Sequence, residues 1–102
     1  MSDLEDLWGN YCDCIRPPDV GDVDDVRLGE LDDEISLLVS NYVGAGQLSD
    51  PARVARLGLA LADLTRVLPR IEPKATKQYF AMVESLARAT LVAIQMKAPH
   101  EC

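Results

Sequence analysis

The chain of 102 residues, 48% of them hydrophobic, has the length of one domain and enough apolar residues for a modest core. Its formal net charge of −7 excludes a protein that is attracted as a whole to nucleic acid or to anionic lipid. Its three cysteines are odd in number, which argues against a secreted disulfide framework, and its acidic first residues lack the apolar segment of a secretion signal.

A short helix is predicted over residues 3–11. Ser2 and Glu5 have the spacing of a capping box, in which each side chain satisfies a free backbone N–H at the helix start. Trp8, the only tryptophan, is expected to anchor this helix on the body of the domain. The apolar residues recur three and four positions apart and would share one side: Leu4, Leu7, Trp8 and Tyr11.

Residues 12–23 are predicted to form an acidic loop, because Pro17 and Pro18 cannot continue a helix. A second helix is predicted over residues 25–43, and Gly29 weakens its first turn enough that it could begin only at Glu30. Its apolar residues follow the helical period: Leu28, Leu31, Ile35, Leu38, Val39, Tyr42 and Val43.

A third helix is predicted from the Ser49-Asp50-Pro51 cap to Pro69, with an apolar seam that includes Val54, Leu57, Leu61, Leu64 and Leu68. A fourth is predicted over residues 73–97. Each carries a row of small residues, which predicts that the two helices pack closely as an antiparallel pair. The rows are Ala55, Gly58 and Ala62 in the third helix and Ala81, Ser85, Ala89 and Ala93 in the fourth.

These elements predict an all-α fold: one domain over residues 1–102, built as a small bundle of three long helices plus a short N-terminal helix, with a flexible tail at 98–102. No alternating pattern predicts a strand. The third and fourth helices carry more apolar surface than a small domain hides, which predicts a homodimer. The residues expected at the dimer and packing faces are Val54, Leu57, Gly58, Leu61, Leu64, Leu68, Met82, Leu86 and Ala89.

Charge is divided unevenly along the chain. Residues 1–50 hold 13 acidic and 2 basic side chains, whereas residues 51–102 hold 4 acidic and 8 basic ones. We expect the two halves to pair with each other, within one chain or across a dimer. The longest apolar stretch, at residues 91–94, is far shorter than the ~20 residues of a membrane helix, so we expect no membrane contact and a cytoplasmic location.

A zinc site is one alternative that the sequence leaves open. Cys12, Cys14, His100 and Cys102 are all the cysteines and histidines of the chain, and thiolate and imidazole are suitable zinc ligands. The single residue between Cys12 and Cys14 argues against this site, because zinc motifs separate paired cysteines by two to four residues. No metal and no cofactor is therefore expected.

Catalytic patterns are weak. The aspartates from Asp22 onward do not match a calcium loop, because position five of that loop would be Val26. Glu30, Asp33 and Glu34 have spacings that suit a dimetal site, but the fourth helix offers only Glu84 to complete it. No serine or histidine lies in a nucleophile motif. These patterns predict a protein that is not an enzyme.

The leading hypothesis is a non-enzymatic regulatory protein that binds a partner with a basic surface, for example as an inhibitor that occupies a nucleic-acid-binding groove. The residues expected to face that partner are Asp22, Asp24, Asp25, Asp32, Asp33 and Glu34. A nucleic-acid accessory protein is the other alternative, although the net charge disfavours binding to nucleic acid. It would use the basic residues of the second half: Arg53, Arg56, Arg66, Arg70, Lys74 and Lys77.

Overall fold

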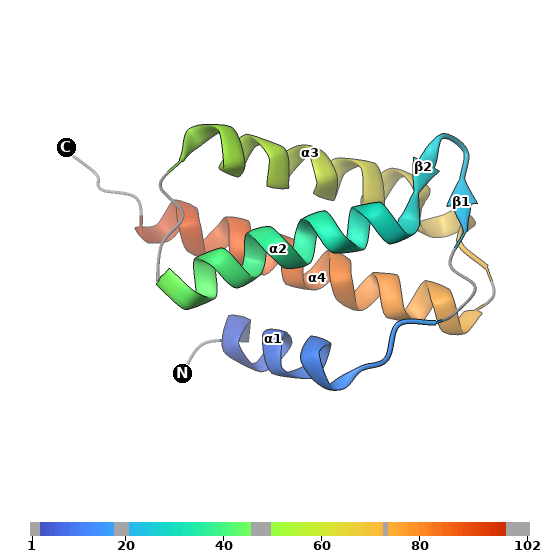
Figure 1. Cartoon of the computed structure of the whole chain (residues 1–102), viewed down its shortest axis with the longest axis horizontal. Helices are drawn as coiled ribbons and strands as arrows, with labels where there is room; N and C mark the ends of the chain where they lie inside the picture. The colour runs from blue at the N-terminus through green and yellow to red at the C-terminus, as the bar shows by residue number, and fades with distance from the viewer. Residues whose placement is uncertain (1–2, 18–20, 46–49, 73, 98–102) are drawn as a thin grey trace.

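Helix α4, Lys74–Lys97, is the central element of the molecule and packs against each of the other helices. The computed structural model describes residues 3–17, 21–45, 50–72 and 74–97. Within these ranges the other helices are α1 (Asp3–Asp13), α2 (Leu28–Ala45) and α3 (Pro51–Val67). Successive helices alternate in direction, so that α1 and α3 run one way and α2 and α4 the other (Figure 1). The all-α bundle predicted from the sequence is confirmed.

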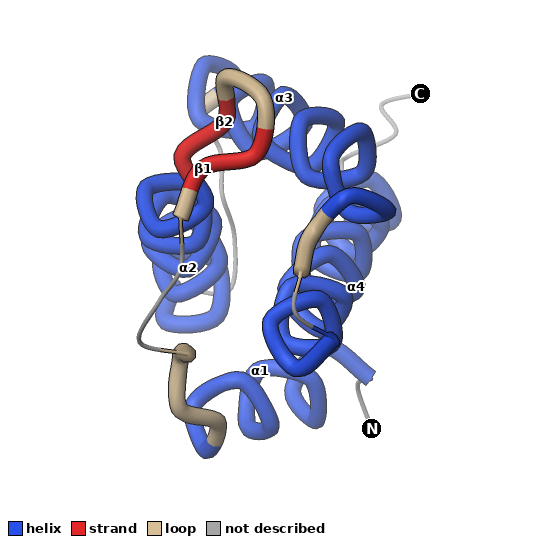
Figure 2. The backbone as a smooth tube through the Cα atoms, turned by 90° about the vertical axis from the view of Figure 1, so that its right-hand side faces the viewer, coloured by secondary structure: helices blue, strands red, loops and turns tan. Residues whose placement is uncertain are grey.

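The core is built from one apolar face of each long helix, and the view along the helices shows α1 and α3 at opposite edges of α2 and α4 (Figure 2). Fully burying each large apolar side chain contributes about 1.5–3 kcal/mol. Helix α1 adds Leu4 to this core, and Leu7, Trp8 and Tyr11 pack against it as predicted. The central buried residues are Ile35, Leu38 and Val39 of α2, Leu57, Leu64 and Val67 of α3, and Phe80, Val83 and Leu86 of α4.

The ends of α3 follow from its sequence. Asp50 caps the helix by accepting a hydrogen bond from the backbone N–H of Ala52 at 3.0 Å, and Pro51 occupies the first turn, where its missing N–H costs nothing. Helix α3 ends at Val67 and continues as a single 3₁₀ turn, η1 (Leu68–Arg70), which contains Pro69. These boundaries confirm the predicted start and end of the third helix.

A small β-hairpin precedes α2, where the sequence predicted a loop and then helix from residue 25. Strands β1 (Asp22–Val23) and β2 (Val26–Arg27) pair antiparallel, and α2 begins directly after them at Leu28. Asp24 sits in the turn with φ of 56°, a left-handed conformation that aspartate tolerates better than most residues. Strands of two residues are too short to show an alternating pattern, so no pattern in the sequence predicted this hairpin.

The antiparallel pairing of α3 with α4 is confirmed, but the predicted small-residue contact is wrong. Ala55 and Ala62 are exposed, and a Cβ atom added at Gly58 would meet nothing within 4 Å. Helix α3 instead buries its large side chains together with Ala60. Burial of Leu57 and Leu64 removes more apolar area from water than burial of the small row would, which explains the choice of face.

Candidate functional site

Asp32 lies buried where α1, α2 and α4 meet, and does not lie on the surface predicted to face a partner. Its side chain is only 1% exposed. It accepts hydrogen bonds from the hydroxyl of Tyr11 at 2.8 Å and from the hydroxyl of Tyr79 at 2.7 Å. The guanidinium of Arg16 adds a third contact at 3.3 Å. The prediction that Asp32 is surface charge is therefore wrong, because this carboxylate serves as an acceptor inside the domain.

The two tyrosines are held as hydrogen-bond donors. Burial raises the pKa of Tyr11 and of Tyr79 above the ordinary value of 10.0, and the hydrogen bonds to Asp32 raise it further. The ring of Tyr11 also stacks on Trp8 and lies 6.2 Å, centroid to centroid, from that of Tyr79. Charge and aromatic packing thus fasten α1 to α2 and α4 at the same place.

Arg16 extends this attachment beyond the end of α1. Besides Asp32, its guanidinium donates to a carboxylate oxygen of Asp33 at 2.9 Å and to the backbone carbonyl of Gly29 at 3.3 Å. Its side chain is 41% exposed, so these bonds lie at the boundary between the buried carboxylate and water. The first residues after α1 are consequently tied to the first turns of α2.

Four other acidic residues that were predicted to face a partner already face arginines of the same chain. Asp33 pairs with Arg16. The other three pairs join the acidic first half to the basic second half, as the charge division predicted. They are Asp24 with Arg70 at 3.1 Å, Asp25 with Arg66 at 3.5 Å, and Glu34 with Arg56 at 3.2 Å.

Every arginine of the chain is engaged in this way: Arg16, Arg27, Arg53, Arg56, Arg66, Arg70 and Arg88 each lie within 4.0 Å of a carboxylate oxygen. Among the described acidic side chains, those without an ion pair gather mainly on α1, where Glu5, Asp6 and Asp13 are exposed. Asp22 and Glu72 are also unpaired. We call Glu5, Asp6 and Asp13 the acidic face of α1; it carries negative charge that no neighbouring cation offsets.

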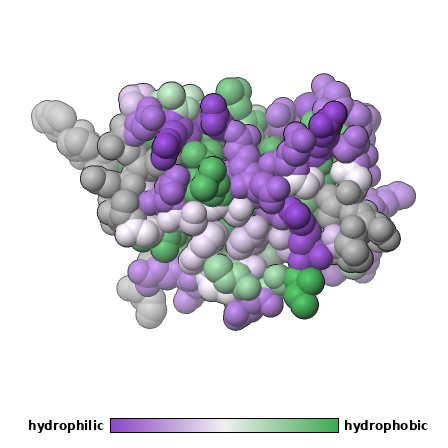
Figure 3. All heavy atoms as spheres, viewed as in Figure 1, coloured by the Kyte–Doolittle hydropathy of each residue, from purple (hydrophilic) through white to green (hydrophobic). Residues whose placement is uncertain are grey.

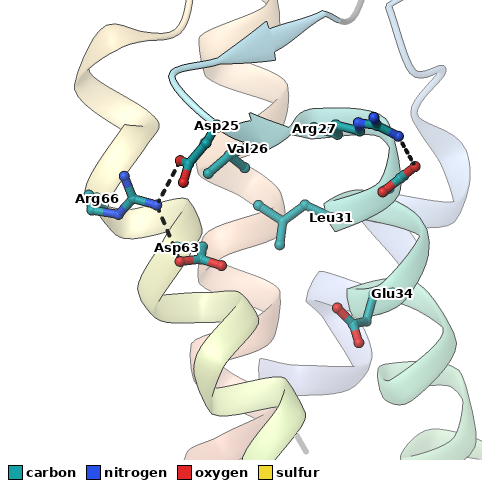
Figure 4. Close-up of a pocket in the computed structure, with 8 residues that line it drawn as sticks. Asp25, Val26, Arg27, Leu31, Glu34, Asp63 and Arg66 are labelled. Atoms are coloured by element: carbon teal, nitrogen blue, oxygen red, sulfur yellow. Dashed lines mark hydrogen bonds and ion pairs between the residues drawn. The ribbon is translucent and has the colours of Figure 1, made fainter.

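A groove of about 240 Å³ lies between the hairpin, α2 and α3 (Figure 4). Arg66 reaches from α3 toward Asp25 and Asp63 on one side, and Val26 and Leu31 lie between this cluster and Arg27. Each charged group that lines the groove has an ion-pair partner: Arg27 pairs with Glu30, Arg66 with Asp25 and Asp63, and Glu34 with Arg56, which lies outside the lining. Charged groups that are already paired have few free hydrogen-bonding positions with which to recognise a ligand.

The basic surface predicted for a nucleic-acid accessory protein is largely neutralised. Arg53 pairs with Asp50 and Arg56 with Glu34. The other two arginines, Arg66 and Arg70, pair with aspartates in the turn of the hairpin. Of the lysines whose side chains are described, Lys74 and Lys77 have no carboxylate partner, and both line a depression of about 650 Å³ at the start of α4. Two lysines form a much smaller cationic surface than the six residues in the prediction.

Cys14, one of the residues considered for a zinc site, lies far from the end of α4. His100 and Cys102 lie outside the described residues. Cys14 contacts Met82, fifteen residues before Lys97, and a helical rise of about 1.5 Å per residue places these two levels of α4 about 22 Å apart. Cys14 and the end of α4 therefore lie at distant levels of the bundle.

The carboxylates considered for a dimetal site have other partners. Glu30 pairs with Arg27, and Glu84 accepts hydrogen bonds from Thr65 and Arg88. Within the described ranges, no group of three or more His, Cys, Asp or Glu side chains is placed to hold a metal ion. Sequence reasoning also missed the place of Tyr79 beside Asp32, and it expected Met82 at a dimer or packing face, where the structure places it beside Cys14.

The residues expected at a dimer face are largely used inside one chain. Leu57, Leu64 and Leu86 are fully buried, and the rest of the seam, Val54, Leu61 and Leu68, packs half-buried against the same core. Among the side chains that the structure describes, the large apolar ones that stay exposed are Ile15, Leu37, Leu59 and Val92. Homodimerisation stays a prediction.

Hydrophilic residues cover most of the molecular face on which α2 lies in front, and hydrophobic residues show there as small separate groups (Figure 3). No helix in the described part of the chain is both long and apolar enough to span a membrane. No protein-family model, no curated protein and no solved structure matches this chain.

Proposed function

We propose that this protein acts without catalysis, by binding another protein whose surface is basic, and that the acidic face of α1 makes the first contact. The observation that carries the proposal is the distribution of unpaired charge. All the arginines face carboxylates of the same chain, and three of the five described carboxylates left without a cation lie on α1. A basic partner would meet the uncompensated part of the −7 charge there.

The way α1 is attached supports this role. Glu5, Asp6 and Asp13 stand on a helix whose other side is fixed by Leu4, by Trp8 and by the hydrogen bond from Tyr11 to Asp32. A surface on a fixed helix loses little conformational freedom on binding, so less of the interaction energy is offset by ordering. Uncompensated negative charge also accelerates encounter with a basic partner and selects among partners.

The acidic residues of the hairpin and α2 have a smaller part in the proposal than the sequence indicated. Asp24 and Asp25 are exposed and Glu34 is partly exposed, but an arginine of the same chain already faces each of them. A partner cation would have to displace that arginine, so the gain from a new pair is reduced. The unpaired acidic residues of α1 can therefore be compared with an equal number of paired acidic residues in the hairpin and α2.

The experiment compares two triple variants that each remove three negative charges. The first neutralises the acidic face of α1 with Glu5→Gln, Asp6→Asn and Asp13→Asn. The second neutralises paired residues with Asp24→Asn, Asp25→Asn and Glu34→Gln. A partner captured from cells by cross-linking and identified by mass spectrometry is purified, and its association rate with each variant is measured by stopped flow over a range of salt concentrations.

We expect the α1 variant to associate about tenfold more slowly at low salt, with a flatter dependence on salt, because long-range attraction of this kind is screened by ions. The variant in the paired residues should change the rate much less. Equal association rates for the α1 variant and the natural protein would refute the proposal, as would a larger effect in the paired set.

A nucleic-acid-binding groove is the partner surface that best suits this charge, because such grooves concentrate arginine and lysine. A protein bound there would exclude DNA or RNA and act as an inhibitor. Competition measured with a labelled oligonucleotide distinguishes this case: the acidic protein should displace the oligonucleotide from the captured partner, and the α1 variant should do so less well.

A further inference from the structure

A depression of about 650 Å³ lies between η1 and the first turns of α4. The residues that α4 contributes are spaced three or four positions apart, so they share one side of the helix. They are Lys74, Lys77, Gln78 and Ala81. The other described residues of the lining belong to η1 or directly follow it, and they are Pro69, Ile71 and Glu72.

The size and the apolar part of this depression suit a small organic molecule. Pockets that hold such molecules measure roughly 300–1,000 Å³ and are lined mainly by apolar groups with a few polar ones. The groove beside the hairpin, at about 240 Å³, falls below that range. Ile71 is only 1% exposed, so its side chain forms part of the floor of the depression, and Pro69 and Ala81 add further apolar surface.

The polar part of the lining holds unpaired positive charge. Every arginine of the chain lies within 4.0 Å of a carboxylate, whereas Lys74 and Lys77 have no ion pair in the described structure, and both are exposed. Glu72 lines the same depression, but no ion pair joins it to either lysine. The depression therefore carries a net charge of one positive unit on a protein whose total charge is −7.

The start of α4 adds to this positive potential. The N-terminal end of a helix carries partial positive charge, which favours an anion nearby. The first turn of α4 contains no acidic residue to offset that charge. The lysines and the helix end thus act in the same direction, while the methylene groups of the lysine side chains extend the apolar surface below the two ammonium groups.

We propose that this depression binds a small aliphatic carboxylate, a molecule with one carboxylate group on an unbranched hydrocarbon body. The ammonium groups of Lys74 and Lys77 meet the carboxylate, and the hydrocarbon lies on the apolar surface around Ile71. An aliphatic body fits because the described lining contains no aromatic side chain on which a ring could stack. A single negative charge matches the net positive charge of the lining.

A phosphate head group fits this lining less well. A phosphate monoester carries about two negative charges at neutral pH. It would meet the carboxylate of Glu72 and the overall negative charge of the protein at a greater cost than a carboxylate does. None of the described lining residues belongs to α1, so this site is separate from the acidic face of α1.

The test is calorimetric titration of the full-length protein with hexanoate, octanoate and decanoate. We expect one ligand per chain and an affinity that rises by up to about fourfold for each added CH₂ group that is buried. Octanoate should bind about tenfold more tightly than 1-octanol, because only the carboxylate can accept charged hydrogen bonds from the lysines. Simple apolar association would favour the alcohol instead. Tighter binding of octyl phosphate than of octanoate would overturn the choice of head group.

Charge variants locate the head group. Lys74→Gln and Lys77→Gln should each weaken octanoate binding roughly three- to fivefold, and the double variant roughly tenfold or more, because each removes one ammonium group. The matched control is Arg88→Gln, which removes one positive charge from the same helix outside the depression. This control should leave the affinity unchanged. An equal loss in Arg88→Gln, or none in the double lysine variant, would refute the proposal.

A size variant locates the hydrocarbon body. Ala81→Leu places a larger side chain in the depression and should weaken octanoate binding roughly tenfold, because the ligand loses part of the surface that it contacts. Circular dichroism checks that this variant keeps its helices. The matched control is Ala62→Leu on α3, whose side chain is exposed outside the depression, and it should bind octanoate as the natural protein does.

A spectroscopic measurement on the natural protein does not depend on any substitution. With the isoleucine methyl groups labelled, octanoate should shift the NMR signal of Ile71 and leave those of Ile35 and Ile94 unchanged. Ile15 is 90% exposed and reports non-specific association of hydrocarbon chains, so its signal should also stay in place. An unshifted Ile71 signal, or a shift confined to Ile15, would overturn the proposal.

Discussion

Helices α1 and α3 lie at opposite edges of the bundle and are attached to it in different ways. Helix α3 buries Leu57, Leu64 and Val67 completely, and its ion pairs with the hairpin and α2 lie in water at its rim. Helix α1 is shorter, and among its described side chains only that of Leu4 is less than a tenth exposed. The attachment of α1 depends on the buried carboxylate of Asp32.

The difference shows where charge matters for stability in this molecule. An exposed ion pair exchanges contacts with water for contacts of similar energy, so its net contribution is about 0–1 kcal/mol. A buried carboxylate is stable only while its donors are in place, and loss of either side leaves polar groups without partners. The edge of the bundle at α1 should therefore be sensitive to single polar substitutions, whereas the edge at α3 should tolerate them.

The largest expected effect comes from Asp32→Ala. This change leaves the hydroxyls of Tyr11 and Tyr79 without their acceptor at a site closed to water. We expect the free energy of unfolding to fall by about 2–4 kcal/mol, measured by urea denaturation. Trp8 is the only tryptophan and lies on α1, so its fluorescence reports the docking of this helix while circular dichroism reports the bundle.

The control for this variant is Asp33→Ala, which removes a neighbouring carboxylate bonded to the same arginine but 73% exposed. It should cost less than about 1 kcal/mol. If α1 detaches before the bundle unfolds, the fluorescence transition of Asp32→Ala will precede the circular dichroism transition. Losses of similar size in the two variants would remove the distinction between buried and exposed charge.

The spacing of apolar residues in the sequence does indicate that Asp32 is buried. Asp32 lies four positions after Leu28 and three before Ile35, so it shares the apolar side of α2. It was treated as one of three consecutive surface acids, Asp32-Asp33-Glu34. A carboxylate on a core-facing stripe requires donors, and Tyr11 stands on the predicted apolar side of its own helix.

Other features were beyond sequence reasoning because they depend on how distant segments meet. Helix positions and the caps of α3 follow from local patterns, and these predictions were accurate to a few residues. The contact of Cys14 with Met82 spans 68 positions, and the bond of Arg70 to Asp24 spans 46. The periodicity of a sequence does not tell how two helices are rotated relative to each other, and this rotation decides such contacts. The prediction of a small-residue contact at Gly58 was wrong for the same reason.

A smaller effect is expected from Tyr79→Phe, which removes one hydrogen-bond donor to Asp32 while Tyr11 and Arg16 remain. Near neutral pH the free energy of unfolding should fall by about 1–2 kcal/mol. The pKa of Tyr79 is raised in the folded state, so the stability that its protonated hydroxyl contributes is fully present below pH 10, the ordinary value, and is lost as pH rises above it.

The variant lacks this ionisation, so its stability should decline less steeply than that of the natural protein above pH 10. Urea denaturation on both sides of that pH measures the difference. Tyr11→Phe should act in the same direction, because burial and Asp32 also raise the pKa of Tyr11. Parallel declines in all three proteins would mean that neither hydroxyl is held in its protonated form by the fold.

The smallest effects are expected at the other edge, from Arg66→Gln and Arg70→Gln. Arg66 is 51% exposed and its partner Asp25 is 85% exposed, while Arg70 and Asp24 are 68% and 41% exposed. Each substitution should lower the free energy of unfolding by less than about 0.5 kcal/mol, measured by urea denaturation in low and high salt. A loss above about 1.5 kcal/mol would show that these arginines fix the hairpin against α3 and η1. The acidic residues of the hairpin would then be structural, and still less free to meet a partner than their exposure indicates.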